Sequence, residues 1–206
     1  MTPESNPAGD VTGSPADPRD DHASGARPGG DIVVRLADGD DLDGVVTVGR
    51  TAWQTNSANF IPEDILELLL AKWWTKDANV SAIRAGRTFV AERGGEIVGM
   101  AAYGVHEGSL VVWKVYVLPD AQGLGIGGRL LDAVYRHAPD AHDHVYLSLT
   151  DGNVSGLAFA RAQGFVEDRR EAQSGMPDLV WMRRDVAPSH GTDPTPVRTA
   201  TEEDPS

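Results

Sequence analysis

The segment QGLGIGG, residues 122–128, decides how this sequence is interpreted. It has four glycines in six positions and leads into the apolar pattern of a helix expected to run to about residue 138. Glycine costs about 1 kcal/mol relative to alanine within a helix, so this density indicates a backbone that another group must approach closely. Loop amides that lead into a helix N-terminus bind phosphate groups. The segment therefore predicts a site for a phosphate-bearing ligand, with a simple tight turn as the alternative.

A dinucleotide site is a second interpretation of the same glycines. Gly123, Gly125 and Gly128 match the spacing G-x-G-x-x-G, and Asp151 lies at the end of a later strand. That fingerprint requires glycine directly after the first strand of an early βαβ unit. Here five residues separate Val117 from Gly123, and the preceding strands are predicted to form hairpins. The surroundings therefore disfavour a dinucleotide.

The hydrophobic periodicity on either side of this segment predicts a mixed sheet flanked by helices, an α/β (α+β) fold. Asp40 or Asp41 is suited to cap the first helix, and Pro62 to begin the second. The turn at Gly94-Gly95 predicts a β-hairpin. The expected strands are 32–36, 88–93, 96–105, 110–117, 144–150, 165–170 and 179–183, and the expected helices are 42–53, 62–73, the helix that ends near 138, and 154–163.

Composition divides the chain into a core and two tails. Residues 1–30 and 186–206 are rich in proline and poor in large apolar side chains, so both are expected to be disordered tails around a domain at 31–185. The formal charge of −13 argues against nucleic-acid binding. No apolar run approaches the roughly 18 residues of a membrane helix, and no signal core is visible near the N-terminus. The absence of cysteine excludes thiolate chemistry, and we expect a cytoplasmic protein with no membrane partner.

The motif Gln122-x-x-Gly125-x-Gly127, preceded by the apolar strand that ends in Leu118-Pro119, resembles the acyl-CoA-binding motif of the GCN5-related N-acetyltransferase (GNAT) family. Asn153, Phe159 and the pair Gly164-Phe165 match the last helix of the family and its exit. The resemblance covers residues 31–185. It implies a mostly antiparallel central sheet flanked by helices and splayed at the two strands around a CoA cleft.

The resemblance also implies which residues bind the cofactor, acetyl-CoA. The loop would hold the pyrophosphate, the strand before it would pair with the pantetheine arm, and Asn153 would reach that arm from across the cleft. The backbone N–H of Val115 would polarise the thioester carbonyl and is therefore a catalytic candidate. The implied cofactor-binding residues are Val115, Tyr116, Val117, Gln122, Gly123, Leu124, Gly125, Ile126, Gly127, Gly128 and Asn153.

Two positions depart from the family pattern. Val111 stands where some members have a glutamate base, and Ala160 stands where many have a tyrosine acid. The acceptor side of the cleft is expected to be built by the 53–62 loop and the Tyr103–Ser109 bend. This makes His106 and Glu107 candidate bases in place of the glutamate, although a solvated hairpin tip is the simpler explanation of both.

Three further side chains could serve a site. Lys114 either faces the cleft, where it would favour an acidic or phosphate-bearing acceptor, or extends to solvent. His142 and His144 lack nearby cysteines or aligned carboxylates, so no metal site is expected.

The resulting hypothesis is a transfer of the acetyl group from acetyl-CoA to a primary amine of a small molecule or peptide. Direct attack in a ternary complex fits, since no cysteine is available to carry the acyl group. The alternative is a non-catalytic acyl-CoA-binding sensor or regulatory module. The sequence does not identify the acceptor, and it leaves a homodimer open.

Overall fold

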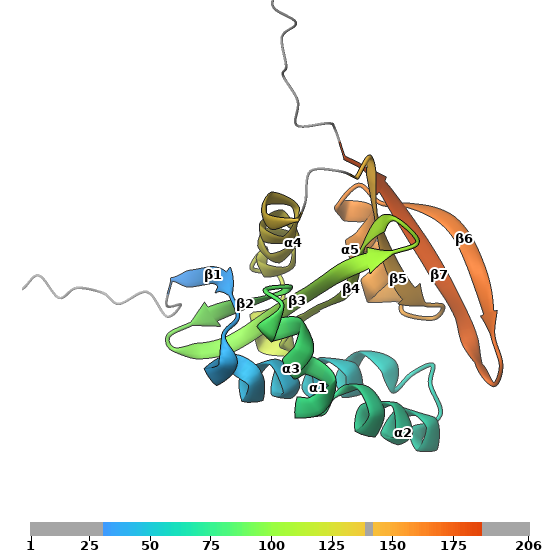
Figure 1. The fold of residues 1–206 in the computed structure, drawn as a ribbon. Helices are drawn as coiled ribbons and strands as arrows, with labels where there is room; N and C mark the ends of the chain where they lie inside the picture. The colour runs from blue at the N-terminus through green and yellow to red at the C-terminus, as the bar shows by residue number, and fades with distance from the viewer. Residues whose placement is uncertain (1–30, 139–141, 187–206) are drawn as a thin grey trace, which may run out of the picture.

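The computed structural model describes residues 31–138 and 142–186 as a seven-stranded sheet with flanking helices (Figure 1). The strand order is β1-β2-β3-β4-β5-β7-β6, and every neighbouring pair is antiparallel except β4–β5. Residues 1–30 and nearly all of the tail expected at 186–206 lie outside the described residues, so their disorder stays a prediction. The strands are β1 Ile32–Leu36, β2 Thr88–Arg93, β3 Glu96–His106, β4 Ser109–Val117, β5 His144–Thr150, β6 Val166–Gln173 and β7 Met176–Asp185.

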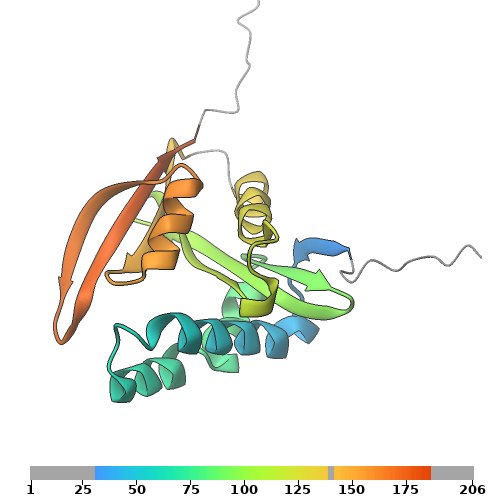
Figure 2. The same ribbon diagram turned by 180° about the vertical axis from the view of Figure 1, so that it is seen from behind.

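Helices cover the two faces of the sheet with separate hydrophobic clusters (Figures 1 and 2). On one face lie α1 Leu42–Ser57, α2 Glu63–Trp73 and α3 Lys76–Arg84, and on the other lie α4 Ile126–His137 and α5 Val154–Ala162. The amphipathic α4 buries Leu130, Leu131 and Val134 completely. This arrangement confirms the predicted fold class.

The sheet opens at the parallel pair in its centre. β4 and β5 are paired only from Leu110–Val112 to Val145–Leu147, and the rest of β4 has no strand partner on that side among the described residues. A bulge begins at the same point, because Tyr103 pairs with Val112 while Ala102 pairs with Lys114. A bulge bends its strand and increases the local twist. β4 therefore leaves β5, and one backbone edge becomes available to a ligand.

Two local expectations required correction. The expected helices do not include residues 76–84, but α3 occupies Lys76–Arg84, and Thr75 accepts a hydrogen bond from the Ala78 amide at its N-terminus. The last hairpin is also longer than the predicted strands 165–170 and 179–183.

The N-terminus of α1 is not capped by the side chain of Asp40 or Asp41, although the sequence predicted such a cap. Asp38 accepts the capping hydrogen bond of the short turn that precedes α1, from the Asp40 amide at 2.9 Å. Asp41 stands at the N-cap position of α1 but makes no side-chain capping bond to that helix. Its carboxylate instead binds the Arg35 guanidinium through two contacts of 2.6 and 2.9 Å. Arg35 consequently holds the pKa of Asp41 below its usual range.

The packing of Trp74 against α1 gives a first prediction. A Cβ at Gly49 would lie 1.9 Å from the Trp74 ring, so Gly49→Ala is expected to cost about 2 kcal/mol of unfolding free energy through overpacking. Chemical denaturation measures this loss. Gly39→Ala is the matched control, since a Cβ there has no neighbour within 4 Å. Equal losses in the two variants would contradict the packing explanation.

Candidate active site

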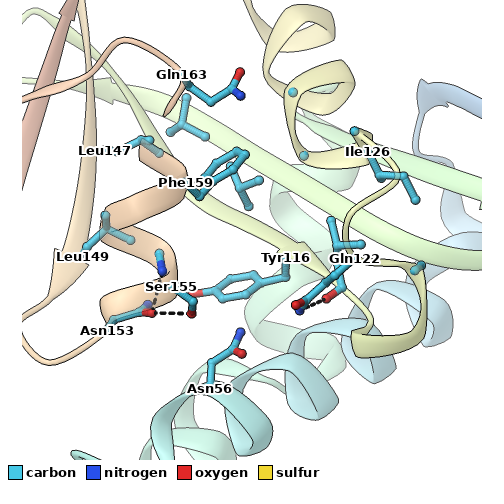
Figure 3. A pocket seen from close by; sticks show the side chains of 18 of the residues that line it. Asn56, Tyr116, Gln122, Ile126, Leu147, Leu149, Asn153, Ser155, Phe159 and Gln163 are labelled. Atoms are coloured by element: carbon cyan, nitrogen blue, oxygen red, sulfur yellow. Dashed lines mark hydrogen bonds between the residues drawn. The ribbon is translucent and has the colours of Figure 1, made fainter. Parts of the chain in front are cut away.

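A cavity of about 410 Å³ lies where β4 parts from β5 (Figure 3). Its walls come from the end of β4, the glycine segment, the end of β5 and α5. All of the predicted cofactor-binding residues line this first cavity except Leu124, which is exposed. The lining contains no charged side chain. A phosphate group would therefore be bound there by backbone amides and by the N-terminus of α4.

The loop before α4 owes its shape to two glycines in the left-handed region. Gly123 and Gly125 have φ values of 79° and 73°, and Gly125 is the N-cap of α4. A Cβ at either position would have no neighbour within 4 Å, so the space beside this backbone is open. The Gln122 side chain donates a hydrogen bond to the Val117 carbonyl at 3.2 Å and ties the loop to β4 (Figure 3).

The next two glycines have a different role. A Cβ at Gly127 would lie 2.8 Å from the Phe159 ring, and one at Gly128 would lie 3.3 Å from the Gln163 side chain. These glycines therefore allow α4 and α5 to pack closely. The glycine density therefore reflects helix packing as well as the open loop, and not only the approach of a ligand expected from the sequence.

Asn153 lies at the N-terminus of α5 and faces the loop across the first cavity (Figure 3). Its Oδ1 accepts hydrogen bonds from the Gly156 amide at 2.9 Å and from the Ser155 hydroxyl at 3.2 Å. Nδ2 has no hydrogen-bond partner within the described part of the chain. Because the carbonyl is held by the helix cap, the amide group of Asn153 is oriented and able to donate.

A second cavity of about 410 Å³ lies on the side of α1 and α2. The predicted 53–62 segment contributes Trp53, Ser57 and Phe60 to it, and the β6–β7 hairpin contributes from the other side. The predicted Tyr103–Ser109 bend lines neither cavity. Five residues line both cavities, so the two spaces meet where β4 and β5 part: Trp113, Tyr116, Ser148, Leu149 and Asn153.

Tyr116 places a hydroxyl group at this junction. Its oxygen accepts a hydrogen bond from Trp53 Nε1 at 2.7 Å, and its ring extends toward Asn153 and Ser155 (Figure 3). Burial raises the pKa of Tyr116 to about 12, so the phenol stays protonated at neutral pH. The resemblance implied a role only for the strand that contains this residue, and no pattern in the sequence indicated the side chain.

Lys114 faces the second cavity rather than bulk solvent. Its Nζ donates to Asn79 Oδ1 at 2.6 Å and lies 4.4 Å from the centre of the Trp74 ring. Burial lowers the pKa of Lys114 to about 8. Lys114 and Tyr116 are the two titratable side chains among the residues that line the cavities.

His106 and Glu107 are not brought to either cavity. They lie at the exposed β3–β4 turn, where His106 Nε2 is 3.9 Å from Glu107 Oε1 and the imidazole packs on the edge of Trp113. The two positions that depart from the family pattern are buried, since Val111 is 1% exposed and Ala160 is 0% exposed. Ala160 belongs to the hydrophobic core and does not line the first cavity.

Residues 31–138 and 142–186 contain neither a membrane-spanning helix nor a metal site. No helix in these ranges is long and apolar enough to cross a membrane. These ranges also contain no group of three His, Cys, Asp or Glu side chains arranged to hold a metal ion. His142 instead lies with Nδ1 3.1 Å from the Gly108 carbonyl oxygen.

Comparison with known proteins agrees with this geometry. The model of the acetyltransferase (GNAT) family matches residues 51–165, and the chain belongs to this family. It is therefore an acyl-CoA-dependent N-acetyltransferase. A probable N-acetyltransferase of Mycobacterium tuberculosis is 26% identical over 145 residues, which span 68% of this chain and 82% of the relative.

Solved structures share the fold over most of the chain. The PaiA N-acetyltransferase of Thermoplasma acidophilum, in complex with coenzyme A, has a TM-score of 0.66 at 18% identity and covers 76% of this chain and 99% of its own. YncA of Salmonella typhimurium, with acetyl-CoA, has a TM-score of 0.56 at 21% identity and covers 80% of this chain and 99% of its own. A ribosomal-protein-alanine N-acetyltransferase from Brucella melitensis has a TM-score of 0.54 at 28% identity and covers 75% of this chain and 99% of its own.

Proposed function

We propose that this enzyme transfers the acetyl group of acetyl-CoA directly to a primary amine of a small molecule or peptide in a ternary complex. The observation that supports this most strongly is the meeting of the two cavities where β4 and β5 part. The first cavity would bind the donor and the second the acceptor. Structural neighbours in complex with coenzyme A or acetyl-CoA support the choice of donor.

The donor would be held mainly by backbone groups. The amides of the glycine loop and the N-terminus of α4 would bind the pyrophosphate. The unpaired edge of β4 at Val115 and Val117 would pair with the pantetheine arm as an added strand does. The oriented Nδ2 of Asn153 would donate to the same arm from the α5 side.

The reaction forms one bond and breaks another. The neutral amine attacks the thioester carbonyl carbon, and the Val115 N–H would stabilise the resulting oxyanion. The intermediate then loses its C–S bond, the amine nitrogen gives up a proton to water, and the thiolate takes one from a protein donor that this water reprotonates. Tyr116 is the proposed proton donor to the thiolate, because its protonated hydroxyl group lies at the junction of the cavities.

The direct experiment is a screen of primary amines for acetyl-CoA-dependent thiol release, with mass spectrometry of the products. The expected result is at least one amine that gains the mass of one acetyl group. Binding of acetyl-CoA without product from any amine would favour the non-catalytic alternative.

The lining of the second cavity also predicts the pH dependence. It contains no carboxylate or imidazole, and Val111 replaces the glutamate of other members. An amine with a pKa near 10.4 must lose its proton before attack, which costs about 4–5 kcal/mol at pH 7. For an amine with an uncharged body, such as 2-phenylethylamine, kcat/KM is therefore expected to rise roughly tenfold per pH unit from pH 7 to 9. A plateau already at pH 7 would instead reveal a base with a low pKa.

A further inference from the structure

The second cavity carries a positive charge in an otherwise acidic protein. Sixteen residues line it, none is acidic, and Lys114 is the one cation among them. The chain as a whole has a formal charge of −13. The cavity thus has the opposite charge to the protein that surrounds it.

The ammonium group of Lys114 is held in place without being neutralised. Asn79 is 3% exposed, and its Nδ2 donates to the carbonyls of Trp73 at 3.1 Å and Thr75 at 2.8 Å. These two bonds orient Oδ1 toward Lys114 Nζ, 2.6 Å away. No carboxylate within the described residues forms an ion pair with Nζ. An amide oxygen and a ring face position the cation but leave its charge available to a ligand.

The rest of the lining is mainly aromatic and aliphatic, with a minority of uncharged polar side chains. Trp53 and Trp73 pack edge to face with their ring centres 5.3 Å apart. Leu149, Met176 and Leu179 add aliphatic surface. Such walls suit a hydrophobic or aromatic ligand body. The aromatic lining residues are Trp53, Phe60, Trp73, Trp74, Trp113 and Tyr116.

We propose that the acceptor is a primary amine that also carries a carboxylate and an apolar, preferably aromatic, body. Its carboxylate pairs with Lys114, its body packs on the tryptophan walls, and its amine reaches the junction at Tyr116. This inference rests on the proposed function, because it identifies the acceptor class of the same reaction. A diamine fits poorly, since its second ammonium group would lie near Lys114 with no acidic partner in the lining.

The test compares two probes that differ only in the carboxylate, L-phenylalanine and 2-phenylethylamine. In the wild-type enzyme, kcat/KM at pH 7 is expected to be about tenfold or more higher for L-phenylalanine, which is typical of a charge-assisted contact. Lys114→Met is expected to lower this preference about tenfold, through a higher KM for L-phenylalanine, while Lys114→Arg retains most of it. Lys76→Met is the matched control, because Lys76 is an exposed lysine outside both cavities.

Each outcome has a distinct meaning. A preference for 2-phenylethylamine or 1,4-diaminobutane, or a carboxylate preference that is as large in Lys114→Met as in the wild-type enzyme, overturns the inference and leaves the proposed function intact. An equal fall of kcat for both probes in Lys114→Met also overturns it, because that result indicates proton transfer rather than recognition. If no amine of any class is acetylated, the proposed function fails and this inference fails with it.

Discussion

A Gly125→Asp variant is expected to bind acetyl-CoA about a hundredfold more weakly than the wild-type enzyme. Gly125 has a φ of 73° and is the N-cap of α4, where the left-handed backbone costs other residues about 1–2 kcal/mol. The open space beside it is the proposed pyrophosphate position, so the new carboxylate would also place like charge against the ligand. The strain lowers stability in the free and bound protein alike, so the loss of affinity comes from the repulsion and the lost space, for which about 3 kcal/mol corresponds to a hundredfold. Isothermal titration calorimetry with coenzyme A measures it.

Gly86→Asp is the matched control for this prediction. Gly86 also has a positive φ, of 64°, and a Cβ there would have no neighbour within 4 Å, but it lies outside both cavities. Both variants carry a similar backbone strain and the same added charge. They are expected to lose similar thermal stability, while only Gly125→Asp loses affinity. Unchanged affinity in a folded Gly125→Asp protein would show that the loop does not bind the pyrophosphate.

Most of the residues that line the first cavity, the proposed donor site, could be predicted to lie together because they are close in the sequence. An apolar strand, a glycine loop and an amphipathic helix follow one another from Leu110 to about residue 138, so their order alone places the loop at a strand-to-helix junction. The positive φ values of Gly123 and Gly125 agree with that pattern. Leu124 departs from it, because adjacent side chains of a tight loop point in different directions and only some can face the ligand.

The lining of the proposed acceptor cavity could be predicted only in part, for the 53–62 segment, because its other contacts join distant segments. The hydrogen bond between Trp53 and Tyr116 spans 63 positions, and the one between Asn79 and Lys114 spans 35. No periodic pattern in the sequence indicates that either pair of residues is in contact. Asn79 also lies on α3, a polar helix with only Ile83 as a buried apolar residue, so the hydrophobic pattern did not indicate that helix. The directions of Lys114 and Tyr116 depend on the bulge in β4, which no residue type at that position marks.

The side chain of Tyr116 carries the last prediction. Tyr116→Phe removes the proposed proton donor but keeps the ring, so kcat is expected to fall about a hundredfold at pH 7, within the range of general-acid catalysis. Affinity for coenzyme A should stay nearly unchanged, because the backbone of β4 is retained. The deficit should shrink above about pH 8.5, where the thiol product is itself ionised and the leaving group no longer needs a proton. A pH–rate profile with one confirmed amine measures both effects.

Tyr103→Phe separates this catalytic role from a structural one. Tyr103 is also a buried tyrosine of the same sheet, but it lines neither cavity, so its variant should keep the wild-type kcat at every pH. Loss of the Trp53 hydrogen bond in Tyr116→Phe could lower stability, yet a purely structural effect would not diminish as the pH rises. A Tyr116→Phe deficit that is the same at pH 7 and pH 9 would therefore assign the residue to positioning and leave the thiolate to be protonated by water.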